Sequence, residues 1–243
     1  MFLLYKKSSD LHLRCPDIKS QAIFHLIDTI IIVLFLNIIP THVYSENADQ
    51  YSLYPKDWWQ PFPRETAPAW EILPQEATYG IDVILSKRTE LGIFSNFANT
   101  PFEFDGKTYA SIEGFWQMMK YPDPDDAYDP RYRKDLIWKY TREEVSQLSG
   151  FDAKHAGEAA KENYEKLGIK WISYRGKRME YKGKDQDEHY RLIFRATQSK
   201  IEQNLKAKEL LMKTGNLILR PDHQQSPDAT PAYRYHEILM RIR

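Results

Sequence analysis

GIFSNFANTPFEFDGKTYASIEGFWQMMK, residues 92–120, is the stretch on which the predicted fold depends. It begins with Phe94–Phe97, where Ser and Asn stand between two Phe residues, as in a polar-tipped aromatic turn. Phe102–Tyr109 then predicts two short strands around Asp105-Gly106, because Asp-Gly is among the strongest short signals for a β-hairpin. An aromatic turn followed at once by a hairpin forms a compact unit of the kind that holds a ligand.

A helix is expected directly after this hairpin, beginning at Ser111. The Ser111 hydroxyl can accept hydrogen bonds from free amides of the first turn, and Glu113 lies where the helix dipole favours an acid. Glu113, Gln117 and Lys120 are spaced i, i+4 and i+7, so they share one face of the helix. This face is either a solvated polar stripe or, where aromatic neighbours bury Glu113 and raise its pKa, a general-acid site. Spacing alone favours the solvated stripe.

Length and composition limit the classes of protein that this chain can be. Its 243 residues are 42% apolar, which is enough for one substantial core. The 34 basic and 34 acidic residues balance, so no global field attracts nucleic acid or a membrane surface. The single cysteine, Cys15, excludes an intramolecular disulfide and a cysteine-based zinc site. The sequence contains no glycine-rich phosphate loop, HExxH motif or Gly-x-Ser-x-Gly motif, and its histidines are too scattered to predict a metal site.

The N-terminal 45 residues have the pattern of a signal peptide. Basic residues precede an apolar run at Ala22–Ile39, which Pro40 ends, and small residues stand before a cleavage site after Ser45. We therefore expect export to the periplasm or the cell exterior, with residues 1–45 contacting the membrane during export. A retained membrane anchor and a buried core helix are the alternatives, because the apolar run has a borderline length for a membrane span.

Residues 46–78 predict an extended arm in front of a single domain at 79–243. Ser45–Gln75 is dense in proline, which is incompatible with a helix or an interior strand. The same segment contains three tryptophans, Trp58, Trp59 and Trp70. Because exposing three large apolar rings to water is unfavourable, we expect these side chains to hold the arm against the domain.

Within residues 79–243 the sequence predicts a helix-rich α+β domain with a few short strands. Thr141 and Glu144 form a capping box for a helix that ends at Gly150, and Asp152 is expected to cap the next helix. The other expected helices are Ala153–Leu167, Asp187–Asn204 and Leu205–Thr214. The expected strands outside the hairpin are Ile81–Leu85, Trp171–Tyr174, Leu217–Leu219 and Glu237–Arg243.

Residues 92–120 resemble the signature of the NADAR superfamily, the NAD- and ADP-ribose-associated proteins that include the YbiA-like N-glycosidases. Matches to that signature occur in order at Ser95, Asn96, Phe97, Pro101, Asp105, Gly106, Lys107, Tyr109, Ser111, Glu113, Gln117 and Lys120. Three later segments are also similar to segments of the family, namely Ala153–Ala160, Phe194–Asn204 and Leu210–Gly215. The resemblance extends over Ile81–Arg243 and implies a single α+β, YbiA-like domain.

The resemblance implies a hydrolase that cleaves a ribosyl N-glycosidic bond. Known members act on phosphoribosyl-aminopyrimidine intermediates of riboflavin synthesis or remove ADP-ribose from guanine bases. In this sequence Glu113 matches the catalytic carboxylate, and Lys120 matches the lysine proposed in some members to engage C1 of the sugar. The expected substrate contacts are Ser95, Asn96, Phe97, Trp116, Gln117, Arg178, Glu180, Tyr181 and His223. The expected partner is a small nucleotide or ADP-ribosyl substrate, or an ADP-ribosylated nucleobase in nucleic acid, with no cofactor and no metal.

The chemistry of these residue types agrees with that assignment. Cleavage of a ribosyl C–N bond gives the sugar oxocarbenium character and leaves negative charge on the departing base. A carboxyl group such as Glu113 can stabilise the cation or, with a raised pKa, donate a proton. Lys120 could attack C1 as a Schiff-base nucleophile if its pKa were lowered. Arg175, Lys177 and Arg178 are candidates for phosphate contacts, with a solvated turn as the alternative.

The sequence also departs from the family pattern. Gly114 stands where the family usually has His, and Arg178–Tyr181 replaces an Arg-x-Asp-Trp element. The Trp-Gly-rich loop before the last strand is replaced by Arg220–Tyr235. In that loop the chemically able side chains are Asp222, His223, Tyr233 and Arg234. Two alternatives to an enzyme therefore stay open: a non-catalytic module that binds ADP-ribose or a nucleotide, and an exported structural domain whose arm contacts a partner. Nothing in the sequence indicates an oligomeric state.

Overall fold

The computed structural model describes residues 53–243. The segment 1–45, expected to be a signal peptide or a membrane anchor, lies outside the described residues, as does the start of the arm. Within residues 53–243, no helix combines the length and the apolar character that crossing a membrane requires.

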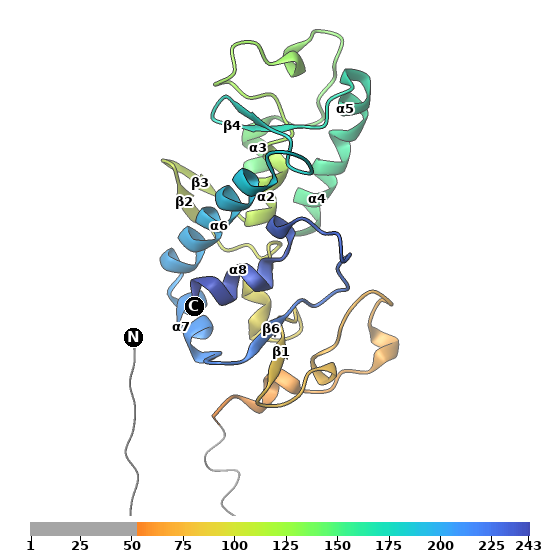
Figure 1. Ribbon diagram of the computed structural model, residues 1–243. Coiled ribbons are helices and arrows are strands. Elements are labelled where there is room, and N and C mark those ends of the chain that lie inside the picture. The colour runs from red at the N-terminus through yellow and green to blue at the C-terminus, as the bar shows by residue number, and fades with distance from the viewer. Residues whose placement is uncertain (1–52) are drawn as a thin grey trace, which may run out of the picture. The chain divides into compact units, whose positions relative to one another are not determined.

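The described part of the chain has the predicted α+β fold, rich in helix and poor in strand (Figure 1). The α-helices are α2 (Ile112–Met118), α3 (Arg142–Ser146), α4 (Gly150–Ala159), α5 (Lys161–Leu167), α6 (Gln186–Gln203), α7 (Leu205–Lys213) and α8 (Tyr235–Ile242). Short 3₁₀ helices are η1 (Lys56–Trp59), η2 (Arg64–Thr66), η3 (Pro74–Glu76), η4 (Glu90–Phe94), η5 (Pro130–Tyr132) and η6 (Pro231–Tyr233). The strands pair two by two: β1 (Asp82–Ile84) parallel to β6 (Ile218–Arg220), β2 (Phe102–Phe104) antiparallel to β3 (Lys107–Tyr109), and β4 (Ile172–Tyr174) antiparallel to β5 (Lys177–Met179).

The predicted hairpin and helix cap at the centre of the sequence are confirmed. Asp105 and Gly106 both have left-handed backbones, with φ of 49° and 79°, as a two-residue turn that follows the strand twist requires. Ser111 Oγ accepts a hydrogen bond from Gly114 N at 2.9 Å, and α2 begins there. The hairpin covers the start of this helix, because three of its aromatic rings pack around Phe115. These rings belong to Phe102, Phe104 and Tyr109.

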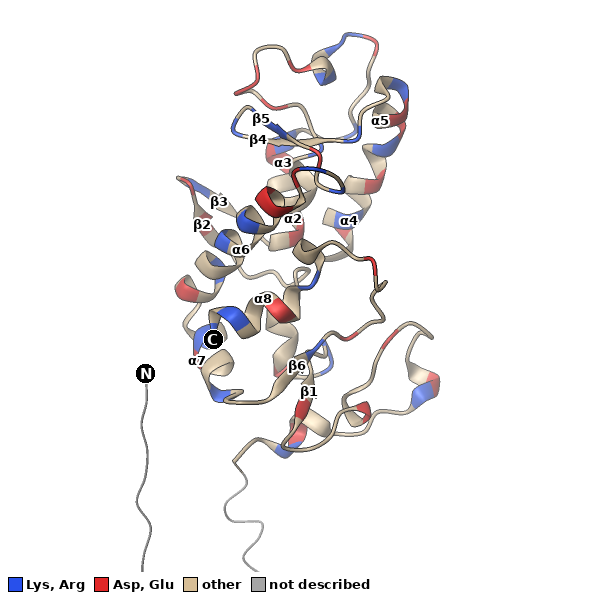
Figure 2. Ribbon diagram, in the orientation of Figure 1, with Lys and Arg blue, Asp and Glu red and all other residues tan. Residues whose placement is uncertain are grey.

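The sequence predicts only the first strand of a second hairpin, β4–β5. Arg175 and Gly176 form its turn, with φ of 51° and 74°. Arg-Gly is not among the dipeptides that usually signal such a turn, and β5 carries no apolar run, so the second strand has no visible pattern. The hairpin presents Arg175 and Lys177 to solvent, among acidic and basic residues that are interspersed along the other elements (Figure 2).

The closing strand predicted at Glu237–Arg243 is wrong, because these residues belong to helix α8 and its end. Ile238, Met240 and Ile242 are apolar at every second position, as in a strand. However, Ile238 and the adjacent Leu239 are both buried, which one face of a helix permits and a one-sided strand does not. The helix packs against β6 and α6, so burial on two neighbouring positions outweighs the alternation.

The single helix predicted at Ala153–Leu167 is two helices, α4 and α5, which meet at Ala160. The first of them begins earlier than expected, and Ser149 rather than Asp152 is the residue before its first turn. Gly168 ends α5 with a left-handed φ of 64°, as predicted. The helical periodicity is therefore confirmed, whereas the break at Ala160 has no signal in the predicted pattern.

Two hydrophobic clusters hold the domain together. The first surrounds α2 and includes side chains of the β2–β3 hairpin, β4 and α6. The second surrounds the β1–β6 pair and includes side chains of α7 and α8. The arm joins this second cluster, since Trp58 is only 1% exposed and its Nε1 donates to Glu90 Oε1 at 2.9 Å. Trp59 Nε1 donates to Asp82 O at 2.9 Å, which ties the arm to β1.

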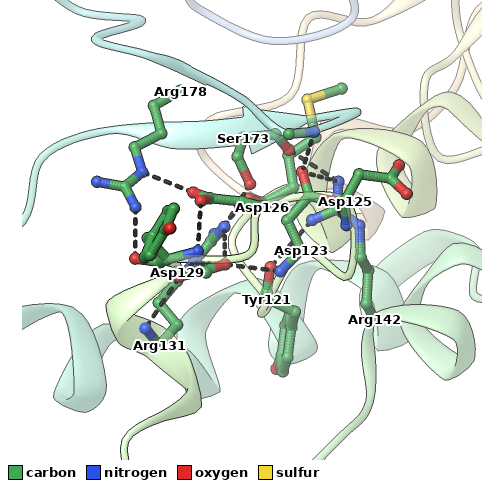
Figure 3. A network of polar contacts seen from close by, with 12 residues as sticks. Tyr121, Asp123, Asp125, Asp126, Asp129, Arg131, Arg142, Ser173 and Arg178 are labelled. Atoms are coloured by element: carbon green, nitrogen blue, oxygen red, sulfur yellow. Dashed lines mark hydrogen bonds and ion pairs between the residues drawn. The ribbon is translucent and has the colours of Figure 1, made fainter.

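The acidic, proline-broken loop after α2 is held by a buried polar network (Figure 3). Asp129 and Arg131 have fully buried side chains and form a two-pronged ion pair, with Nε–Oδ1 at 2.9 Å and Nη2–Oδ2 at 2.7 Å. Arg131 also donates to Met119 O at 2.8 Å and to Ser173 Oγ. A second arginine, Arg142, donates to the carbonyl oxygens of Met118, Tyr121 and Ser173. The network therefore joins the loop to the end of α2 and to β4.

Gly114 lies where α2 comes closest to the α3–α4 connection. A Cβ at this position would meet Leu148 O at 2.4 Å and Val145 O at 2.9 Å, so a side chain would point at this backbone rather than into a site. Gly114→Ala is expected to lower the free energy of unfolding, measured by urea denaturation, by about 1–3 kcal/mol, the usual range for overpacking. Gly183→Ala is the control, because its Cβ would have only ordinary contacts at 3.4 Å or more. Equal losses in the two variants would contradict this close approach.

Candidate active site

A cavity of about 550 Å³ lies on the Glu113 side of α2. Its wall combines the Ser95–Phe97 turn with Glu113 and Gln117 of α2 and with His189 of α6. The loop after β6, Trp70 of the arm, Lys87, and Phe151 and Lys154 of α4 also line it. Segments that are far apart in the sequence thus meet around the helix that the sequence marks as functional.

Glu113 faces this cavity and is shielded from solvent, with an exposed fraction of 9%. Its Oε1 accepts a hydrogen bond from Gln117 Nε2 at 2.7 Å, and its main-chain N–H donates to Asn96 O at 2.9 Å. Burial raises the pKa of Glu113 above its ordinary value, against the Gln117 hydrogen bond and the charges of Lys120 and Lys154. Such a carboxyl group holds its proton more readily than a solvated one and suits proton donation. The solvated alternative therefore does not apply to Glu113 and Gln117.

The close approach of α4 holds Gln117 beside Glu113. A Cβ on Gly157 would lie 1.7 Å from Gln117 Oε1, so glycine is the residue that leaves room for this side chain. Gln117 Oε1 is buried and accepts no hydrogen bond within the described residues. Because buried polar atoms are usually paired, this oxygen suits a donor brought by a ligand.

Lys120, the third residue of the predicted stripe, lies just beyond the end of α2. Its Nζ is 3.4 Å from Gly157 O and 5.7 Å from the centroid of the Trp116 ring. Burial lowers the pKa of Lys120. The structure does not place Lys120 among the described residues that line the cavity, although its charge acts on Glu113.

The predicted Ser95–Phe97 turn is brought to Glu113, and all three of its residues line the cavity. Phe97 N donates to Ser95 Oγ at 3.2 Å, which closes the turn. Lys200 of α6 is buried and donates from Nζ to Ser95 O at 2.9 Å. The Phe97 ring meets Phe151 of α4 edge-on, with centroids 5.4 Å apart. Contacts from two helices thus fix the turn.

Lys200 should give the domain a distinctive dependence of stability on pH. Burial lowers the pKa of Lys200 from 10.5 to about 7. Between these values the unfolded chain binds the proton and the folded chain does not, so the free energy of unfolding should rise by roughly 1 kcal/mol per pH unit. Urea denaturation at several pH values between about 7 and 10 measures this slope. The slope should be lost in Lys200→Met. It should be kept in Lys208→Met, which replaces an exposed lysine of α7. The same slope in both variants would mean that Lys200 does not cause it.

Trp116 is the centre of an aromatic cluster that borders the cavity. Its ring centroid lies 4.6 Å from His189, 5.0 Å from Tyr181 and 5.9 Å from Tyr233. Trp116 and Tyr233 line the cavity, whereas Tyr181 packs on Trp116 without lining it. The structure therefore brings the predicted Trp116 to Glu113, and Tyr181 supports it from behind.

His189 is a cavity residue that the sequence did not single out. Its side chain is fully buried, and neither ring nitrogen has a hydrogen-bond partner within the described residues. Burial lowers the pKa of His189 to about 4, so the ring is neutral near pH 7. Two unpaired buried nitrogens suit a ligand that carries hydrogen-bonding groups. The sequence signal for His189 as a cavity residue is its position four residues before Ile193, on the apolar face of the predicted helix.

Arg178 and Glu180, predicted as substrate contacts, are not brought to this cavity. Arg178 Nε pairs with Asp126 Oδ2 at 2.7 Å, and its guanidinium lies over the Trp171 ring. Glu180 is exposed, with its carboxylate 3.7 Å from Lys184 Nζ. The β4–β5 hairpin is the reason, because it directs Arg178 toward Asp126 and Tyr128 of the loop after α2, and Glu180 follows its second strand. The Arg/Lys run is thus a solvated turn at this place.

The arm and the loop after β6 pair with each other beside the cavity. Ile72 N donates to Asp222 O at 2.9 Å, and Gln224 N donates to Trp70 O at 3.4 Å. Trp70, Gln224 and the intervening His223 all line the cavity. The structure therefore brings His223 to the same cavity as Glu113, and a pairing with the arm holds it there.

A second cavity, of about 670 Å³, lies beside the polar network of Figure 3. Its buried Arg131 and half-buried Arg142 already bond to Asp129, Ser173 and main-chain carbonyl oxygens. Among residues 53–243, no group of three or more His, Cys, Asp or Glu side chains is arranged to hold a metal ion. The Glu113 cavity is the stronger candidate for an active site. The buried acid of the second cavity, Asp123, already accepts from Arg142 and Gly176 N, whereas Glu113 has a raised pKa and a carboxyl group that faces its cavity.

Comparisons with protein-family models and with curated proteins give no match to this chain. Among solved structures, the chain is similar to the NMR structure of the E. coli protein YbiA. That likeness covers 67% of this chain and 83% of YbiA, with 21% sequence identity and a TM-score of 0.42.

Proposed function

We propose that this chain hydrolyses a ribosyl N-glycosidic bond in a nucleotide-like substrate, an ADP-ribosyl or phosphoribosyl compound. The observation that carries the proposal is the buried carboxyl group of Glu113, which has a raised pKa and lies in the wall of an aromatic cavity. The resemblance of residues 92–120 to the NADAR signature supports the same reaction and points to the same carboxyl group.

In the proposed reaction, Glu113 donates its proton to the departing nitrogen as the C1–N bond breaks. The electron pair of that bond goes to the nitrogen, and positive charge develops at C1 and the ring oxygen. A water molecule forms the new C1–O bond and loses a proton, and the Glu113 carboxylate regains a proton from solvent. The apolar surroundings keep the proton on Glu113 until the base departs.

The other walls of the cavity suit the two halves of such a substrate. Phe97 and Trp116 offer ring faces against which a planar base can pack. His189 and Gln117 Oε1 are unpaired and buried, and the hydroxyl groups of a ribose can donate to or accept from them. These contacts would hold the sugar beside Glu113.

Phosphate recognition in this proposal belongs to Lys87 and Lys154, which line the cavity, rather than to Arg175 and Lys177. Lys87 Nζ donates to Asp222 Oδ2 and lies 5.7 Å from the centroid of the Phe97 ring, close to the position proposed for the base and sugar. An ammonium has three donors, so those not used by Asp222 can contact a phosphate. Ammonium groups act as point charges for phosphate oxygens. Both lysines come from outside the run that the sequence suggested.

Water, rather than Lys120, is the nucleophile in this proposal. The Lys120 ammonium lies at Gly157 O and near the Trp116 ring, outside the cavity lining. Attack on C1 would require its side chain to leave both contacts. A lowered pKa alone does not bring the amine to the sugar.

The test is the release of a free base by the purified full chain. The substrates are a panel of nucleosides, nucleotides, phosphoribosyl-aminopyrimidines and ADP-ribosylated guanine in DNA, with mass spectrometry of the products. Release of a base together with a free ribosyl compound supports the hydrolase. Tight binding with no release from any member would overturn it and would favour the nucleotide-binding module.

A further inference from the structure

We propose that His223, oriented by Asp222, is the general base that activates the attacking water in the Glu113 cavity. This role rests on the hydrolase function proposed above and adds a second catalytic group to it. Its basis is a hydrogen-bonded Asp–His pair in the loop after β6, on the wall of the same cavity as Glu113. The loop is the one that replaces the Trp-Gly-rich segment of the resembled family.

Asp222 fixes the imidazole of His223 in one orientation. His223 Nδ1 lies 2.9 Å from Asp222 Oδ1, and because a carboxylate only accepts hydrogen bonds, Nδ1 must be the donor. The other ring nitrogen, Nε2, is then the basic atom of the neutral ring. The imidazole lies nearly parallel to the Tyr235 ring, with an interplanar angle of 11°. The tautomer and the orientation that a general base needs are thus both defined.

Asp222 is itself held as a charged acceptor. Its side chain is buried, Tyr235 Oη donates to Oδ1 at 3.3 Å, and Lys87 Nζ donates to Oδ2. Burial raises the pKa of Asp222, but the hydrogen bonds from His223 and Lys87 outweigh it and hold the pKa below its ordinary value. The Asp222 carboxylate, because it stays ionised, stabilises the imidazolium that forms when His223 takes a proton.

The arm sets the position of His223 through the backbone. Glu71 and His223 face each other in an antiparallel bridge. Arg88 holds Glu71 with two hydrogen bonds, Nε–Oε1 at 2.7 Å and Nη2–Oε2 at 2.8 Å, and Arg64 donates to Glu71 O at 2.6 Å. Two arginines therefore anchor the arm segment against which the His223 loop is paired.

Glu113 and His223 divide the two proton transfers of the hydrolysis. The water oxygen bonds to C1 while one of its protons passes to His223 Nε2. The electron pair of the C1–N bond leaves with the nitrogen, which receives the proton of Glu113. The imidazolium then loses its proton to solvent and the Glu113 carboxylate takes one up, which restores both groups. A proton-holding acid and a separate base are what hydrolysis by direct attack of water requires.

His189, the other histidine of the cavity, does not suit this role. It has no carboxylate to orient it and is fully buried, and burial lowers its pKa to about 4, so it is a poor proton acceptor. The side chain of His223 is 40% exposed and lines the cavity, so water can reach its ring. Position and partner both distinguish His223 as the base.

The experiment uses the full chain and the α and β anomers of 4-nitrophenyl ribofuranoside. Nitrophenolate leaves without a proton, so this probe separates water activation from the acid step of Glu113. His223→Ala is expected to lower nitrophenolate release roughly 10²–10⁴-fold, the range for a general base. Added azide, a nucleophile with no proton to remove, should restore release in this variant and yield ribosyl azide. His155→Ala, an exposed histidine of α4, is the control and should match the unaltered chain with and without azide.

Restoration by azide in His223→Ala alone supports the assignment. A loss that azide does not restore would give His223 a structural role and overturn it, as would unchanged release. If the unaltered chain rejects the nitrophenyl probe, the same azide comparison is made on the N-ribosyl compound that it cleaves. A chain that cleaves no ribosyl compound at all would overturn both this assignment and the hydrolase function, whereas cleavage without an azide effect overturns this assignment only.

Discussion

Glu113→Gln is expected to lower the turnover number roughly 10²–10⁴-fold, the usual contribution of a positioned acid, with little change in ligand affinity. Glutamine keeps the shape of the side chain and can still contact Gln117, but it has no acidic proton to transfer to the leaving group. Base release measured by mass spectrometry gives the turnover number, and isothermal titration with the same N-ribosyl compound gives the affinity. A selective loss of turnover is the signature of an acid that acts in the chemical step.

Two controls separate this effect from damage to the fold. Glu165→Gln removes an exposed carboxylate of α5 and should leave turnover and affinity unchanged. The pKa of Glu113 is raised in the folded chain, so the stability that it contributes is present at low pH and is lost as pH rises through that pKa. At neutral pH, Glu113→Gln should therefore be at least as stable to urea as the unaltered chain. Turnover within tenfold of the unaltered value would show that Glu113 is not the acid.

Arg131→Met is expected to lower the free energy of unfolding by about 3–5 kcal/mol, the range for removing one partner of a buried ion pair. The substitution leaves the Asp129 carboxylate buried without its guanidinium. It also removes the donors to Met119 O and Ser173 Oγ, which join the loop to α2 and β4. Urea denaturation, with the midpoint and slope analysed together, measures the loss.

The chain offers a matched control for this pair. Arg133 and Asp135 form an ion pair with the same spacing of two residues, at 2.5 Å, but their side chains are 51% and 61% exposed. Arg133→Met should leave the free energy of unfolding nearly unchanged, since solvent screens exposed pairs. Asp129→Asn combined with Arg131→Met should recover part of the loss, because no charge is then left buried and unpaired. Similar losses in the two single variants would contradict a structural role for the buried pair.

Residues close together in the sequence were sufficient to predict α2, which carries Glu113, the hairpin before it, and α6. The Asp105-Gly106 turn depends on two left-handed backbones, and the cap of α2 depends on the hydroxyl of Ser111 and an amide three residues later. Helix α6 follows from apolar spacing over five turns. In each case the groups that decide the structure are close neighbours along the chain.

The predictions of secondary structure fail where contacts between residues far apart in the sequence determine the structure. α8 reads as a strand because Ile238, Met240 and Ile242 alternate, and only its packing on β6 and α6 shows that neighbouring positions are both buried. β5 has no pattern of its own and exists because it pairs with β4. Arg178 and Glu180, expected to contact the substrate, lie away from the cavity for the same reason, since Arg178 belongs to that hairpin and Glu180 directly follows it.

The sequence by itself indicated Glu113 as a candidate acid and determined the helix that bears it and the turn before it. The spacing of Glu113 and Gln117 does not show whether Glu113 is exposed or buried. The same i, i+4 spacing occurs on solvent-exposed and on buried faces of a helix. Burial was decided by α3, α4 and α6, which pack around α2 in the folded chain. The same holds for His223, which a backbone pairing with the arm brings to the cavity. Backbone N–H and C=O groups can pair with any segment, so no local sequence pattern in the arm or in the loop after β6 predicts their pairing.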